Sequence, residues 1–180
     1  MPTDIDSSTT EYQQAAACQL LVSVRDAREA SLALETGIPW IDLKDPSRGA
    51  LGSPRLEVAR QVADALQAHG MLSAALGELV DLEMDHAVQL ADNFPILKVG
   101  LTNLRNGTRF PEKWKSKLRD LDRQLQAKKA SLVPVIYADW QSCNAISPDA
   151  VTRIAIDLSS SFVLVDTFFK QGKRLLDHVA

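Results

Sequence analysis

Short, continuously apolar segments alternate with amphipathic segments along most of this chain, and this alternation limits its possible folds more than any other feature. Several of the apolar segments are rich in valine and isoleucine, which favour strands. Continuous rather than alternating hydrophobicity is typical of strands buried on both faces, as in a parallel sheet. The predicted strands are Gln19–Val24, Trp40–Leu43, Leu72–Leu76, Ile96–Leu101, Leu132–Tyr137 and Phe162–Val165.

Segments with helical periodicity lie between the predicted strands. Ser53-Pro54 and Ser147-Pro148 each predict an N-cap followed by the first helical residue. Asp81 is expected to cap another helix, and an apolar stripe that begins at Trp114 predicts one more. Because neighbouring parallel strands need such crossovers, the repeated strand–helix units predict an α/β fold.

Two architectures fit this pattern, an open doubly wound sheet and a TIM-type (β/α) barrel. No glycine-rich nucleotide-binding motif follows the first predicted strand, which weakens the open sheet. The chain has 180 residues, whereas eight such units need on the order of 220. We therefore expect an incomplete barrel of about six of the eight units over residues 18–180. Residues 1–17, rich in Ser, Thr, Asp and Gln, are expected to form a disordered leader.

Composition excludes several classes of protein. The formal net charge of −3 argues against binding nucleic acid or an anionic membrane through bulk positive charge. No apolar segment approaches the roughly 20 residues that span a bilayer, and the first residues do not resemble a secretory signal. Cys18 and Cys143 fit no metal-binding or redox spacing. We expect a cytoplasmic protein without a metal or cofactor.

Charged residues gather where the predicted strands end, which is where parallel α/β folds bind ligands. Asp42 and Lys44 are two residues apart, so in an extended chain they point to the same side. The residues at these ends are Asp42, Lys44, Glu78, Lys98, Asp139, Asp166 and Lys170.

Lys98 is the clearest anomaly, because a lysine within an apolar strand is costly unless it has a partner or a function. Two interpretations stay open on pattern alone. Lys98 either extends to solvent or pairs structurally with Asp42, or it belongs to a barrel mouth crowded with lysines and aspartates. In the second case, neighbouring positive charge lowers the pKa of a lysine, and a neutral amine can form a Schiff base with a carbonyl compound. This chemistry suits small phosphorylated aldehydes or ketones.

Several motifs, in order along the chain, resemble those of the (5-formylfuran-3-yl)methyl phosphate synthases, also called 4-(hydroxymethyl)-2-furancarboxaldehyde-phosphate synthases. The resemblance covers roughly residues 18 to 180. The matching segments are Leu-Leu-Val-Ser-Val (20–24), Ile-Asp-Leu-Lys-Asp-Pro (41–46), Gly-Ala-Leu-Gly (49–52), Ser-Ala-Ala-Leu-Gly-Glu (73–78), Leu-Lys-Val-Gly-Leu (97–101), Val-Ile-Tyr-Ala-Asp-Trp (135–140) and the segment 165–177.

The resemblance implies a barrel lyase of methanofuran biosynthesis that condenses two molecules of glyceraldehyde 3-phosphate into a phosphorylated furan aldehyde. It implies that Lys44 is the Schiff-base lysine and that Lys98 is the proton acceptor. Asp42, Asp166 and Lys170 match further active-site positions of the family. The expected partner is thus a small phosphorylated aldehyde.

The family pattern continues with two further strand–helix units, which do not follow here. We therefore expect a truncated chain with reduced or absent activity, and its unpaired sheet edges leave room for a homo-oligomer. Two alternatives stay open: another lysine-dependent aldolase of the class I type, and a non-catalytic remnant.

Overall fold

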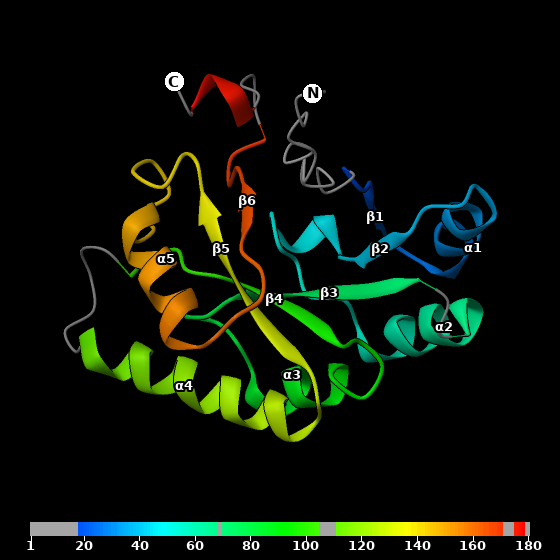
Figure 1. Ribbon diagram of the computed structural model, residues 1–180, viewed down its shortest axis with the longest axis horizontal. Coiled ribbons are helices and arrows are strands. Elements are labelled where there is room, and N and C mark those ends of the chain that lie inside the picture. The colour runs from blue at the N-terminus through cyan, green and yellow to red at the C-terminus, as the bar shows by residue number, and fades with distance from the viewer. Residues whose placement is uncertain (1–17, 68–69, 105–110, 171–174, 179–180) are drawn as a thin grey trace, which may run out of the picture.

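Six parallel strands form one sheet in the computed structural model, which describes residues 18–67, 70–104, 111–170 and 175–178. The spatial order of the strands is the order along the chain, from β1 to β6 (Figure 1). All neighbouring pairs are parallel. The strands are β1 (Leu21–Val24), β2 (Trp40–Leu43), β3 (Met71–Glu78), β4 (Ile96–Gly100), β5 (Ser131–Tyr137) and β6 (Leu164–Asp166).

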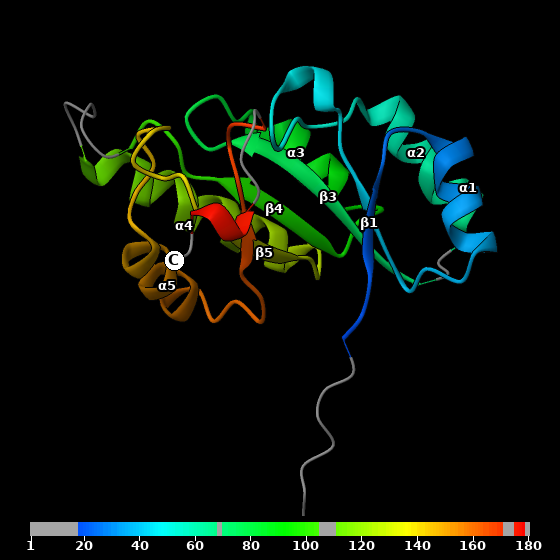
Figure 2. The ribbon, with the colours of Figure 1, turned by 90° about the horizontal axis from the view of Figure 1, so that it is seen from above.

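The helices wrap around the outer side of the curved sheet, as two perpendicular views show (Figures 1 and 2). An open doubly wound sheet reverses its strand order at a switch point, whereas a barrel keeps one direction. The sequential order therefore confirms the predicted incomplete (β/α) barrel. The helices are α1 (Ala27–Glu35), α2 (Leu56–Leu66), α3 (Met84–Leu90), α4 (Pro111–Ala127) and α5 (Pro148–Asp157), with 3₁₀ turns at Pro46–Arg48 and Leu175–Asp177.

The two faces of the sheet differ in character. The outer face contributes aliphatic side chains such as Leu97 and Val99 to the main core, which the helices cover. The inner face carries a smaller apolar cluster that includes Ala75, Val135 and Tyr137. Since successive side chains of a strand alternate between faces, Lys98 of β4 points inward with the residues of this smaller cluster.

Helix starts were predicted with mixed success. Ser147 caps α5 as expected, since its hydroxyl oxygen accepts a hydrogen bond from the Ala150 N–H. The other two predictions were wrong. Helix α2 begins at Leu56 rather than after Ser53, because the Ser53 hydroxyl is buried against a histidine side chain instead. Helix α3 begins after Glu83, and Asp81 lies in the preceding turn.

The start of β2 contacts the segment before β6 across the inner side of the sheet. The Trp40 and Phe162 rings meet edge to face with centroids 5.3 Å apart. This contact reflects the curvature of the sheet, which brings strands distant in order towards each other. Within the described residues β1 and β6 are the edge strands, and the homo-oligomer stays a prediction. The leader predicted for residues 1–17 lies outside the described residues.

Candidate active site

A buried ion pair joins β4 to β2 on the inner face of the sheet. The Lys98 ammonium contacts the Asp42 carboxylate, and both side chains are at least 95% buried. The Asp42 carboxylate also accepts hydrogen bonds from the hydroxyls of Ser73 (2.7 Å) and Ser23 (3.0 Å). The structure thus confirms that Asp42 pairs with Lys98, which was one of the two interpretations of this lysine.

Burial lowers the pKa of Lys98, because the low-dielectric interior disfavours its charged form. The Asp42 carboxylate opposes this by attraction and hydrogen bonding, and the positive charge of Lys44 adds to the lowering. The net direction is downward, so the neutral amine is more accessible at Lys98 than at an ordinary lysine. A neutral amine can accept a proton, which is the property required of a general base.

Lys44 directly follows β2, and its backbone N–H donates to the Val24 carbonyl of β1 at 3.1 Å. Its side chain is partly exposed, unlike that of Lys98. A cavity of about 550 Å³ lies between β1 and α1, with Val22, Val24 and Ala33 of the outer core in its lining, and it also reaches Ser23 and Lys44. Lys98 is not part of that lining. Lys44 is therefore partly accessible, while its charge acts on the buried Lys98.

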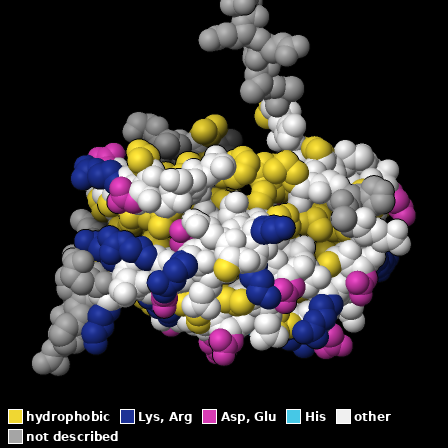
Figure 3. All heavy atoms as spheres, turned by 60° about the horizontal axis from the view of Figure 1, so that its bottom comes forward, with side chains coloured by type: hydrophobic (Ala, Val, Ile, Leu, Met, Phe, Trp, Pro, Cys, Tyr) yellow, Lys and Arg dark blue, Asp and Glu magenta, His cyan; other side chains and the backbone are white. Residues whose placement is uncertain are grey.

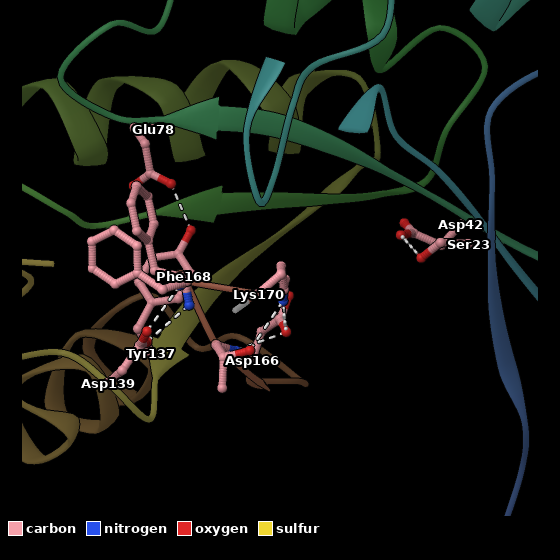
Figure 4. Close-up of polar contacts among 10 residues, drawn as sticks. Ser23, Asp42, Glu78, Tyr137, Asp139, Asp166, Phe168 and Lys170 are labelled. Carbon is pink, nitrogen blue, oxygen red and sulfur yellow. Dashed lines mark hydrogen bonds and ion pairs between the residues drawn. The ribbon is translucent and has the colours of Figure 1, made fainter. Parts of the chain in front are cut away.

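Asp166 and Lys170 form the next part of the site, at the end of β6. Their side chains are 2.5 Å apart at the closest nitrogen–oxygen pair. The Lys170 ammonium also lies 3.3 Å from the Thr167 hydroxyl. The negative charge of Asp166 acts on Lys98, so the two ion pairs share one electrostatic environment. In Figure 4 the Asp166–Lys170 pair lies between Asp42 and a second cluster around Glu78.

The second cluster was missed as part of the site, although Glu78 was recognised as a strand-end residue. The Tyr137 hydroxyl donates to Glu78 Oε1 at 2.5 Å (Figure 4). The Thr102 N–H and hydroxyl donate to Oε2 at 3.0 and 2.8 Å. Tyr137 is almost fully buried, and burial beside this carboxylate raises its pKa, so the phenol remains protonated. The sequence shows only that Glu78 and Tyr137 each end an apolar segment, and nothing in it pairs the two residues.

Asp139 has a local structural role instead of facing the lysines. Its carboxylate accepts hydrogen bonds from the backbone N–H groups of Phe168 (2.8 Å) and Phe169 (2.9 Å). Burial acts to raise the Asp139 pKa, but these hydrogen bonds outweigh it and the net shift is downward. Asp139 therefore fixes the turn that leads from β6 to Lys170.

His86 is partly buried and contacts the loop that follows β2. From α3 its Nε2 lies 3.0 Å from both the Ser53 hydroxyl and the Pro54 carbonyl oxygen. These contacts fasten the loop after Lys44 to α3. Cys143 is buried, as a structural thiol is expected to be, and burial raises its pKa to about 11.

The described residues contain no group of three or more side chains arranged to hold a metal ion. None of the helices in the described part of the chain has the length and apolar character of a membrane-spanning segment. The face seen in Figure 3 carries charged side chains of both signs, interspersed with hydrophobic ones. No large region of positive charge dominates this face.

A parallel (β/α) half-barrel with paired lysines and aspartates on its inner face defines the class of this protein, a barrel enzyme with a polar site inside the sheet. Comparison with known proteins narrows that class. The family model described as 4-HFC-P synthase matches residues 20–180. The chain belongs to this enzyme family.

Curated relatives agree with the family match. The (5-formylfuran-3-yl)methyl phosphate synthase of Methanothermobacter thermautotrophicus is 30% identical over 162 residues, which cover 88% of this chain and 67% of the relative. The enzyme of the same name from Methanocaldococcus jannaschii is 30% identical over 165 residues, covering 88% of this chain and 68% of the relative. The chain thus matches about two thirds of the length of these relatives.

One solved structure with a similar chain course is a xylose isomerase-like TIM barrel protein from Mycobacterium smegmatis in complex with magnesium. Its TM-score is 0.46 and its sequence identity is 16%, over 78% of this chain and 55% of that one.

Proposed function

We propose that this chain forms a Schiff base between Lys44 and glyceraldehyde 3-phosphate, as a step in the synthesis of (5-formylfuran-3-yl)methyl phosphate. The observation that carries the proposal is the convergence of charges on the inner face. Lys98, buried against Asp42, experiences the charges of both Lys44 and Asp166. The names of the relatives supply the product of the proposed reaction.

Lys44 is the better nucleophile of the two lysines, because its side chain is partly exposed while Lys98 is enclosed. Its neutral amine attacks the aldehyde carbon, and loss of water from the adduct gives an imine. Conversion to the enamine requires removal of the proton next to the imine carbon. Lys98, with its lowered pKa, is the proposed acceptor of that proton.

The aspartates serve the two lysines in different ways. Asp42 holds the Lys98 amine in a fixed position, since two serine hydroxyls orient its carboxylate in turn. Asp166 orients Lys170, whose ammonium group is exposed enough to meet a substrate phosphate. Attack of the enamine on a second aldehyde, hydrolysis of the resulting imine to free Lys44, ring closure, and net loss of phosphate and water complete the proposed reaction. We place this reaction in the cytoplasm, where two free cysteines remain reduced.

Trapping with borohydride across a panel of aldehydes tests this proposal. The protein is mixed with glyceraldehyde 3-phosphate, glyceraldehyde, or acetaldehyde, then reduced, and its intact mass is measured. The proposal predicts a stable adduct of reduced glyceraldehyde 3-phosphate, with much less adduct from the aldehydes that lack phosphate. Equal trapping of all three would favour a general lysine-dependent aldolase. No trapping with any of them would favour a non-catalytic protein.

A further inference from the structure

An irregularity in β3 turns Glu78 towards the inner face of the sheet. The pairing of β3 with β4 shifts between Ala75 and Glu78, so three steps along β3 match two steps along β4, from Lys98 to Gly100. Strict alternation from Ala75 would place Glu78 on the outer, helix-covered face. The additional residue reverses that direction, and Gly77, with φ of +85°, adopts the left-handed conformation that the irregularity requires.

Gly100 leaves the space that the Glu78 carboxylate occupies. A Cβ atom at position 100 would collide with both carboxylate oxygens. Gly100 and Lys98 lie two residues apart on the same face of β4, which corresponds to about 7 Å along a strand. The Glu78 carboxylate is therefore held at the level of Gly100, two residues beyond Lys98 towards the carboxyl ends of the strands.

The Glu78 carboxylate is fixed, yet its capacity to accept hydrogen bonds is not filled by the contacts described. Its two oxygens offer about four acceptor positions. Thr102 takes two positions through Oε2, and Tyr137 takes one through Oε1. Glu78 remains partly exposed, and the contacts described leave one acceptor position on Oε1 unused.

We propose that Glu78 binds the hydroxyl group of the substrate aldehyde through Oε1, with Tyr137 and Thr102 as positioning residues. The proposal rests on the proposed function, and it adds a group that recognises the C2 hydroxyl of glyceraldehyde 3-phosphate. In Figure 4 Glu78 and Asp42 lie on opposite sides of the Asp166–Lys170 pair. Lys44 follows β2 and Glu78 ends the neighbouring strand β3, so an aldehyde on Lys44 would meet this acceptor at the end of β3.

A purely structural role for Glu78 is the competing explanation. The carboxylate joins the end of β3 to β5 and to the segment after β4, and this alone would stabilise the sheet. The two explanations differ in one respect. Only substrate binding makes the effect of a Glu78 substitution depend on whether the aldehyde carries a hydroxyl group.

Glu78→Gln is the appropriate variant, because it preserves shape while removing the open acceptor. The Thr102 N–H can only donate, so the amide oxygen stays at the Oε2 position and the amide nitrogen takes the Oε1 position. The Tyr137 hydroxyl can accept from that nitrogen, so the local structure is preserved. Glu57→Gln, an exposed position on α2, is the matched control.

The experiment compares borohydride trapping of glyceraldehyde 3-phosphate with that of 3-phosphooxypropanal, which lacks the C2 hydroxyl. The half-saturating concentration of each aldehyde is measured for the natural chain, Glu78→Gln and Glu57→Gln. A hydrogen bond to a charged group predicts a rise of about 10- to 100-fold for Glu78→Gln with glyceraldehyde 3-phosphate. With 3-phosphooxypropanal the same variant should change the half-saturating concentration less than twofold.

An equal effect of Glu78→Gln on both aldehydes, or no effect on either, would overturn the assignment of Glu78 while leaving the proposed function intact. Absence of any adduct in the natural chain would overturn the proposed function itself, and the assignment with it. Thermal unfolding of each variant is measured in parallel. A variant that unfolds early but keeps the dependence on the hydroxyl group still supports substrate binding.

Discussion

Lys98 and Asp42 form a buried ion pair although their strands are not neighbours, since β3 lies between β4 and β2. On β3, Ala75 lies opposite Lys98 and Ser73 lies opposite Asp42, and the Ser73 hydroxyl also donates to Asp42. Because the β3 side chains between them are small, the long Lys98 side chain of β4 can reach Asp42 of β2. The arrangement couples the position of the Lys98 amine to two other strands.

Removal of Asp42 should destabilise the fold, because it leaves Lys98 buried without its counter-charge. Breaking such a pair by removing one partner costs about 3–5 kcal/mol. We expect the free energy of unfolding of Asp42→Asn, measured by urea denaturation at pH 7, to fall by about that amount. Ser23→Ala removes one hydrogen bond to the same carboxylate and should cost about 1 kcal/mol. A loss no larger in Asp42→Asn than in Ser23→Ala would contradict the role of the pair.

The loss in Asp42→Asn should shrink as the pH rises. Asp42 raises the pKa of Lys98 against the effect of burial, so the substitution moves this pKa further below its ordinary value of 10.5. The unfolded chain then binds more protons than the folded chain at pH values between the lowered pKa and 10.5. Stability rises with pH in that interval. Urea denaturation at pH 7 and pH 9.5 should show the variant recovering part of its deficit, and a deficit that grows with pH would contradict this account.

The pH dependence of enamine formation should report on Lys98. If Lys98 accepts the proton in its neutral form, exchange of the substrate C2 hydrogen for deuterium should increase with pH and level off below pH 10.5, because burial lowers the pKa. Mass spectrometry of recovered aldehyde in deuterium oxide measures this exchange. Lys128→Gln, an exposed lysine paired with Asp92, should leave the profile unchanged. A profile that keeps rising past pH 10.5, without levelling off below it, would contradict a proton acceptor with a lowered pKa.

Gly52→Ala should impair the loop that follows Lys44. A Cβ atom at this position would collide with the Asp45 carbonyl oxygen, and the Gly52 carbonyl accepts a hydrogen bond from the Asp45 N–H at 2.8 Å. We expect at least a tenfold decrease in trapped adduct at Lys44, with a smaller change in the thermal unfolding midpoint. Ser47→Ala in the same loop is the comparison. Equal trapping in both variants would show that the loop does not position Lys44.

The two cysteines should differ sharply in reactivity. Cys18 is exposed, whereas Cys143 is buried and its pKa is raised to about 11 by burial, which suppresses the thiolate. Titration of the native chain at pH 8 with a chromogenic disulfide reagent should therefore label Cys18 rapidly, and Cys143 only after denaturant is added. Rapid labelling of two thiols in the natural chain, or of the remaining Cys143 in Cys18→Ser, would contradict the packing of Cys143.

The fold was largely accessible from the sequence, because buried parallel strands leave continuous apolar segments. Trp40–Leu43 was predicted with the bounds that β2 has, and the lysine in Ile96–Leu101 indicated a buried charge. Glu78 could not be assigned in the same way. Its direction depends on an extra residue in the pairing of β3 with β4, and no single strand shows its register in its own sequence.

Helix starts failed for a related reason. Ser53-Pro54 has the local chemistry of a helix start, but a tertiary contact with His86 uses the Ser53 hydroxyl, and α2 begins three residues after Ser53. Local propensity decides such a position only where no distant partner competes for the same group. The contact between His86 and Ser53 joins residues 33 positions apart, so it leaves no local pattern.

Identification of the modified lysine after borohydride reduction with glyceraldehyde 3-phosphate tests the central claim most directly. Peptide mapping by mass spectrometry should place the adduct on Lys44, and Lys44→Arg should abolish it while keeping the charge and the native unfolding midpoint. An adduct on Lys98 or Lys170, or one of undiminished yield in Lys44→Arg, would contradict the assignment of Lys44 as the Schiff-base residue.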